Sequence, residues 1–194
     1  MFEYLADLYS ELLVVRSTHK VFSWQSIIAF SYFSALVLSI YRAHRYKERF
    51  SDFLSIAVVV VKYLFTSLLM ERVLVYINES GNWQSAQNVY LALFAINVLS
   101  IYFLYLLHSL LSYKLSELFF AVFRITSAIA LAHFVLWFKF IVLDIQEPYP
   151  WVHYSYSFIV LCLSIMLAIA MLFPNILLNR FGCIIGLNLP RGRE

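Results

Sequence analysis

The sequence predicts an all-α integral membrane protein: a bundle of four to five continuous transmembrane helices plus an amphipathic N-terminal helix. Three observations lead to this prediction. Of the 194 residues, 63% are apolar and only 13% are charged, whereas soluble domains carry about a quarter charged residues. Five apolar stretches reach the roughly 20 residues that a helix needs to cross the hydrocarbon core. No Gly or Pro falls inside these stretches, so we expect unbroken helices.

The N-terminal element is predicted over residues 1–15. Glu3, Asp7 and Glu11 recur every four residues opposite an apolar face, which is the pattern of an amphipathic helix. Such a helix can lie in the membrane interface. Because its polar face is acidic and suits anionic lipid poorly, a protein partner is an equally good expectation.

Five spans follow, and together they place the whole chain, 1–194, in one transmembrane domain without a soluble part. The first and last spans carry no formal charge, whereas the second contains Lys62 and the fourth contains Arg124 and Lys139. A charge near the centre of a span costs about 2.5–3.5 kcal/mol, so a four-span bundle with both termini inside remains an alternative. The spans are predicted at 21–41, 53–77, 89–111, 118–142 and 152–173.

The orientation follows from the basic residues of the short loops, which collect on the cytoplasmic side. With five spans, the side that holds the loop 42–49, Lys114 and the C-terminal tail carries more Lys and Arg than the other side. The tryptophans then lie near the opposite face, as an aromatic belt does. We therefore expect the N-terminus outside and the C-terminus inside, in a bacterial inner membrane. The tryptophans are Trp24, Trp83, Trp137 and Trp151.

Three basic residues are candidates for a site within the membrane, namely Lys62, Arg124 and His108. Counted from the inner edges of their predicted spans, Lys62 lies roughly 14 Å deep and Arg124 roughly 10 Å deep, with His108 at a similar depth. All three are therefore expected in the cytoplasmic leaflet. An ionisable residue inside a membrane is a functional hypothesis by default, and an anion or lipid headgroup is the ligand that such a set would bind. Snorkelling or pairing within the bundle is the structural alternative, and a pore lining is the third.

Groups for other chemistry are sparse in the sequence. The span centres hold no Asp or Glu, so no carboxylate pair is available for acid–base catalysis, and the chain is not expected to be an enzyme. Cys162 and Cys183 have neither disulfide nor metal spacing, and we expect no metal site and no cofactor. His133 and His153 keep a haem-binding membrane anchor open as an alternative, although their expected depths match poorly.

These absences favour a non-enzymatic polytopic membrane subunit that acts as a sensor, anchor or scaffold. Such a subunit is expected to form homo-oligomers, to dock a cytoplasmic protein, or both, as in bacterial defence or signalling systems. Arg42, Arg45, Lys47 and Arg49 would form the docking or phospholipid-binding face. The first alternative is an anion- or lipid-conducting channel that uses the inner basic residues. Membrane lipids are expected partners, and the net charge of +3 is too small to suggest direct nucleic-acid binding.

Overall fold

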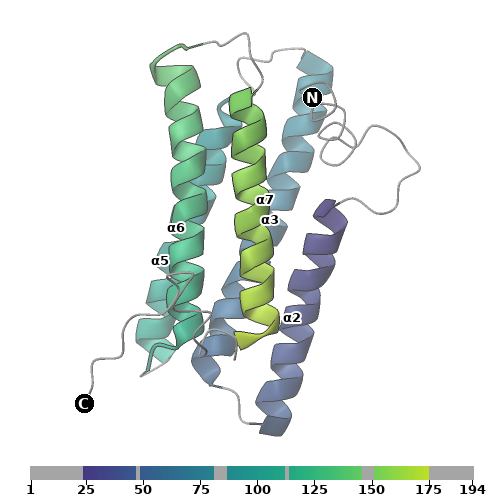
Figure 1. Ribbon diagram of the computed structural model, residues 1–194, viewed down its shortest axis with the longest axis vertical. Helices are drawn as coiled ribbons and strands as arrows, with labels where there is room; N and C mark the ends of the chain where they lie inside the picture. Colours follow the sequence, from purple (N-terminus) through teal and green to yellow (C-terminus); the bar gives the residue numbers. More distant parts are fainter. Residues whose placement is uncertain (1–23, 47–48, 81–86, 112–113, 146–150, 175–194) are drawn as a thin grey trace.

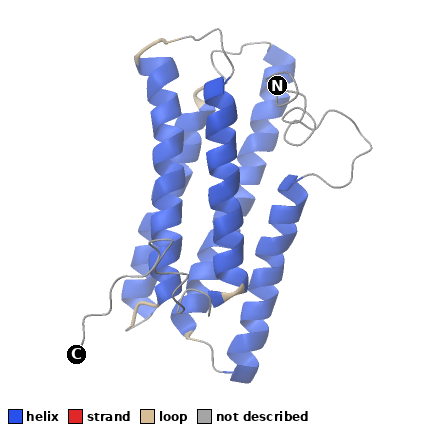
Figure 2. Cartoon of the chain, in the orientation of Figure 1, coloured by secondary structure: helices blue, strands red, loops and turns tan. Residues whose placement is uncertain are grey.

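The computed structural model describes residues 24–46, 49–80, 87–111, 114–145 and 151–174. Within these ranges the chain is helical and contains no strand (Figure 1 and Figure 2). The predicted helix over residues 1–15, the C-terminal tail after residue 174 and Lys47 lie outside the described residues. The helices are α2 (Trp24–Tyr46), α3 (Phe50–Ser80), α5 (Val89–Leu111), α6 (Glu117–Trp137), the π-helical segment η1 (Phe138–Val142) and α7 (Trp151–Leu172).

Five of the described helices are long and apolar enough to cross a membrane, counting α6 and η1 as one. These helices agree with the predicted apolar stretches in number, and their length and composition suggest an integral membrane protein. The third span has the predicted bounds of 89–111. The second candidate span, Phe50–Met70, starts three residues earlier and ends seven residues earlier than predicted, within the longer helix α3, which continues to Ser80. Its 31 residues extend over about 46 Å, well beyond the roughly 30 Å of a hydrocarbon core.

The long helices form a closed ring. Each packs against the next helix in the chain, α7 packs against α2, and α3 also touches α6 across the middle. Successive helices run in opposite directions, so α2 begins at one end of the bundle and α7 ends at the other (Figure 1). The start of α2, the end of α6 and the start of α7 share one end of the bundle (Figure 1). The end of α2 with Arg45, the start of α3 with Arg49, and Lys114 before α6 share the opposite end.

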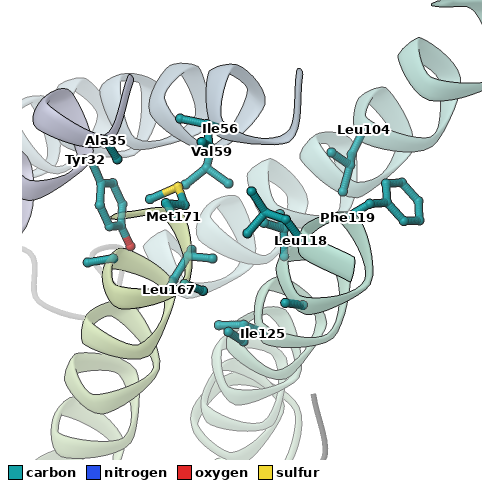
Figure 3. Close-up of a cluster of buried hydrophobic side chains, with 14 of the residues drawn as sticks. Tyr32, Ala35, Ile56, Val59, Leu104, Leu118, Phe119, Ile125, Leu167 and Met171 are labelled. Carbon is teal, nitrogen blue, oxygen red and sulfur yellow. The ribbon is translucent and has the colours of Figure 1, made fainter. Parts of the chain in front are cut away.

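The core lies where α2, α3, α6 and α7 meet (Figure 3). The fully buried Ala35 on α2 offers little side-chain bulk, which lets neighbouring helices approach closely. Tyr32, also on α2, packs edge-on against Tyr63 of α3, with the two ring centroids 5.2 Å apart. Its hydroxyl donates a hydrogen bond to the carbonyl of Ser164 on α7 at 3.2 Å. A polar atom of a buried aromatic side chain thereby joins two helices that are distant in the sequence.

The fourth span departs from the predicted continuous α-helix at η1. The amide of Leu143 donates to the carbonyl of Phe138 at 3.0 Å, and the amide of Ile145 donates to the carbonyl of Lys139 at 3.2 Å. These wide turns replace the α-helical ladder. Asp144 follows with a φ of 48°, a left-handed conformation that Asp tolerates better than most residues with a Cβ. The span therefore ends in a widened turn rather than in a regular helix end.

Candidate functional site

His108 on α5 is fully buried, with 0% of its surface exposed. Its two ring nitrogens each lie near a backbone carbonyl: Nδ1 is 2.7 Å from the carbonyl of Leu104, and Nε2 is 3.1 Å from the carbonyl of Ser51. Its Nε2 lies 3.0 Å from Ser51 Oγ and 3.3 Å from Ser55 Oγ, both on α3. These contacts of Nε2 with Ser51 and Ser55 link α5 to α3.

The same group of residues reaches α6 through Ser116. The hydroxyl of Ser51 lies 3.1 Å from the hydroxyl of Ser116 and accepts a hydrogen bond from the Ser116 amide at 3.1 Å. Ser116 in turn caps α6 by accepting from the amide of Phe119. Phe119 also packs against the His108 ring, with the two ring centroids 4.6 Å apart. One compact cluster therefore connects α3, α5 and α6. We refer to Ser51, Ser55, His108 and Ser116 as the serine–histidine cluster.

Lys62 occupies a different position, near the centre of the candidate span Phe50–Met70. It lies about 18 Å along α3 from Phe50, deeper than the sequence suggested, because the helix begins earlier than residue 53. Its side chain is only 8% exposed, and its Nζ donates to Asn97 Oδ1 at 3.2 Å. Among the described residues its hydrogen-bond partner is thus a neutral amide, and no carboxylate pairs with it.

Two cavities flank Lys62. The larger, of about 560 Å³, is a groove between α3 and α5 that is lined by apolar side chains except for Lys62 and Ser100. The exposed side chains of Phe65 and Phe103 show that this groove opens on the outer surface of the bundle. The smaller cavity, of about 10 Å³, lies toward α6 and is also lined by Thr126. That volume holds about one water molecule, and the buried Thr126 Oγ1 has no hydrogen-bond partner among the described residues.

A third polar contact joins α6 and α7 toward the other end of the bundle. His133 Nδ1 lies 2.5 Å from the hydroxyl of Tyr156. His153 instead stacks on Phe140 at 4.8 Å. His133 therefore lies on α6 and contacts Tyr156, whereas His153 lies on α7 and contacts Phe140, so the two rings do not face each other as ligands of one haem.

The structure does not bring the three predicted basic residues into one site. Asn97, the partner of Lys62, lies about 16 Å along α5 from His108. Arg124 is half-buried on α6 and lines neither of the two cavities beside Lys62. Lys62 and His108 therefore lie at different depths in the bundle, each with its own partners, and Arg124 joins neither of them.

The predicted docking residues also separate. Arg42 donates from Nη1 to the carbonyl of Leu172 and from Nη2 to that of Met171, both at 3.3 Å. It therefore caps the C-terminal end of α7, where cations are favoured. Arg45 is exposed and lies against Tyr41, and Arg49 is exposed before α3. Of the described members of this set, Arg45 and Arg49 are the ones that face outward.

The sequence analysis did not single out Asn97, Thr126 or the serines of the serine–histidine cluster. A signal was present on α5, where the buried residues Leu93, Asn97, Leu104 and His108 form one stripe at helical spacing. Two polar residues on a stripe that is otherwise apolar indicate contacts made inside the bundle. Their partners on α3 depend on tertiary packing and leave no such pattern.

Ser51 and His108 have the distance of a nucleophile and its base, but their surroundings do not suit catalysis. Both are buried at one end of the bundle, and the second ring nitrogen binds a backbone carbonyl instead of an orienting carboxylate. Among the described residues no group of three or more His, Cys, Asp or Glu side chains could hold a metal ion. Comparisons with protein-family models, curated proteins and solved structures give no match for this chain.

Proposed function

We propose that the chain is a non-enzymatic membrane subunit that assembles with at least one further chain inside the membrane. The observation that carries this proposal is a pair of tyrosines on the outer face of α5. Tyr102 and Tyr105 are 57% and 61% exposed, and they lie about 3 Å and 8 Å along the axis from the middle of the span Val89–Leu111. Neither hydroxyl has a hydrogen-bond partner among the described residues.

Lipid tails cannot satisfy a phenol hydroxyl, and a polar group left without a partner in hydrocarbon costs several kcal/mol. Tyrosines that face lipid are normally found near the headgroups. Helical side chains point back toward the N-terminus of their helix. Both hydroxyls are thereby directed away from the nearer end of α5, at Leu111, and toward the middle of the span. A protein surface that covers this face would provide acceptors.

The described interior favours a structural subunit over an enzyme. The serine–histidine cluster, the Arg42 cap and the Tyr32 bond each join two or more helices of the bundle. The end that carries Arg45 and Arg49 would face the cytoplasm of a bacterial cell under the positive-inside rule. A soluble partner or anionic phospholipid would bind there, as expected for a sensor, anchor or scaffold.

The test is site-specific photocrosslinking in native membranes. A photoreactive amino acid at position 102 or 105 is expected to give adducts with protein, either a second copy or another chain. The same group at Leu131, which is 62% exposed on α6, serves as the matched control and is expected to react with lipid alone. Lipid adducts at all three positions, from a chain that also runs as a monomer in mild detergent, would overturn the proposal.

Two further measurements separate the alternatives. Anion flux through vesicles that contain the purified chain alone would replace the subunit with a channel. A Soret absorption band in the purified protein would replace it with a haem anchor. We expect no anion flux and no Soret band.

A further inference from the structure

Lys62 combines three properties that rarely occur together in a helix bundle. It lies near the centre of a span, its described hydrogen-bond partner is the neutral side chain of Asn97, and it lines a groove that opens outward. An ammonium that is buried with only a neutral partner is costly, and intramembrane charges normally pair with an opposite charge. The groove is the route by which such a charge could reach Lys62 from outside the bundle.

The depth of Lys62 limits what can provide this charge. A lipid phosphate lies at the membrane surface, whereas Lys62 lies about 18 Å along α3 from its first residue. A carboxylate on a second transmembrane helix can lie at any depth, including this one. The groove runs from Leu54 to Phe65 on α3 and from Ile96 to Leu107 on α5, which is about 16 Å on each helix. That length accommodates about three turns of an apolar helix.

The candidate spans that the structure describes do not offer an acid near their middle. The acidic residues within three positions of a span end are Glu48, Asp52, Glu71, Glu117 and Asp144, and none lies nearer the middle of a candidate span. A helix of a second copy that occupied the groove would therefore leave Lys62 without a carboxylate. A carboxylate at mid-span depth therefore points to a helix of a different protein.

We propose that the α3–α5 groove binds a transmembrane helix of another protein, and that a single Asp or Glu near the middle of that helix pairs with Lys62. This inference rests on the proposed function and names the chemistry of the partner. The apolar walls of the groove provide packing area. The Lys62 ammonium provides selectivity, because a helix without the acid would leave a buried charge unpaired.

The experiment uses the full chain in phosphatidylcholine vesicles with synthetic helices of about 20 leucine and alanine residues. One peptide carries Glu at its centre, and matched peptides carry Gln or Leu there. Energy transfer between a donor on the chain and an acceptor on the peptide measures association. The Glu peptide is expected to bind about tenfold to a hundredfold more tightly than the Leu peptide, which is the range of a hydrogen bond to a charged group.

Two variants of Lys62 make the test specific. Lys62→Met keeps a long apolar side chain and is expected to remove the advantage of the Glu peptide. Lys62→Glu is expected to bind a peptide with a central Lys and to reject the Glu peptide. A photocrosslinker at Val61, which lines the groove, is expected to capture the Glu peptide, whereas one at Leu131 is not. Helix content by circular dichroism establishes that each variant is folded.

Several outcomes would overturn the inference. Equal binding of the Glu and Leu peptides would do so, as would a Glu advantage that persists in Lys62→Met. Acyl-chain adducts at Val61 that depend on Lys62, without any Glu advantage, would assign the groove to a lipid. Photocrosslinking at position 102 tests the proposed subunit function independently. A protein neighbour found there would support the subunit function even if the peptide experiments refute the groove partner.

Discussion

Replacing His108 tests whether the serine–histidine cluster holds three helices together. His108→Phe keeps an aromatic ring against Phe119 but deletes the hydrogen bonds to Leu104 and Ser51. Hydrogen bonds between membrane helices contribute about 0.6 kcal/mol on average and up to about 1.7. Because Ser51 Oγ keeps Ser116 as a partner, we expect the substitution to lower the free energy of unfolding by about 1–2 kcal/mol.

His108→Ala provides the comparison, since it deletes the same bonds and also leaves a cavity. Removing a buried aromatic ring costs about 3–5 kcal/mol, so this variant should be clearly less stable than His108→Phe. Leu110→Ala is the control, because Leu110 lies on the same helix and is 70% exposed. It should change the free energy of unfolding by less than about 0.5 kcal/mol.

The assay is equilibrium unfolding in mixed micelles with increasing sodium dodecyl sulfate, followed by circular dichroism. The expected order of stability is wild type, then His108→Phe, then His108→Ala. If His108→Phe matches the wild type, the cluster contributes packing alone, and the argument that polar contacts join α3, α5 and α6 is refuted.

Three further predictions use the same preparation. Asn97→Leu removes the neutral partner of a buried ammonium and should destabilise the purified chain by about 3–5 kcal/mol, whereas Lys62→Met should cost about 1–2 kcal/mol. In the Lys62→Met background, Asn97→Leu should then cost less than it does alone, and an additive double variant would contradict the pairing. Arg42→Leu removes the cap of α7 and should speed amide hydrogen exchange in the last turn of that helix while leaving α5 unchanged; equal exchange in both proteins would argue against the cap. Ser116→Ala removes the N-cap of α6 and should cost about 1 kcal/mol, measured by the same detergent titration.

Much of the fold is predictable because the spans are chemically simple. The third span is uninterrupted, so hydropathy alone locates both of its ends at 89 and 111. The second span was placed three residues late at its start because Ser51 and Asp52 look like loop residues. They are helical in the structure, where Ser51 is buried against Ser116. Hydropathy cannot detect a polar residue whose partner lies on another helix.

The site was predictable in part. An isolated lysine in an apolar run identifies Lys62 as unusual without any structure. Its expected grouping with Arg124 and His108 rested on depth alone, and depth does not specify which way a side chain faces. The rotation of α3 against α5 decides that Lys62 meets Asn97, and the low amphipathicity of so apolar a helix contains little information about that rotation. The widened turn at η1 has no signal in the sequence that we could identify.

The ring has a consequence for how the protein is made. The contacts of α2 with α7, from Tyr32 to Ser164 and from Arg42 to the last carbonyls of α7, join residues about 130 positions apart. In a nascent chain that has inserted only the first four helices, the ring is therefore still open. The Tyr32 hydroxyl and the Arg42 guanidinium then lack their acceptors, because α7 has not yet been synthesised. Among the described helices, α7 is the one whose contacts with α2 and α6 close the ring. Chains that stop before residue 151 should consequently remain open, and they should be the species that membrane quality-control proteases remove.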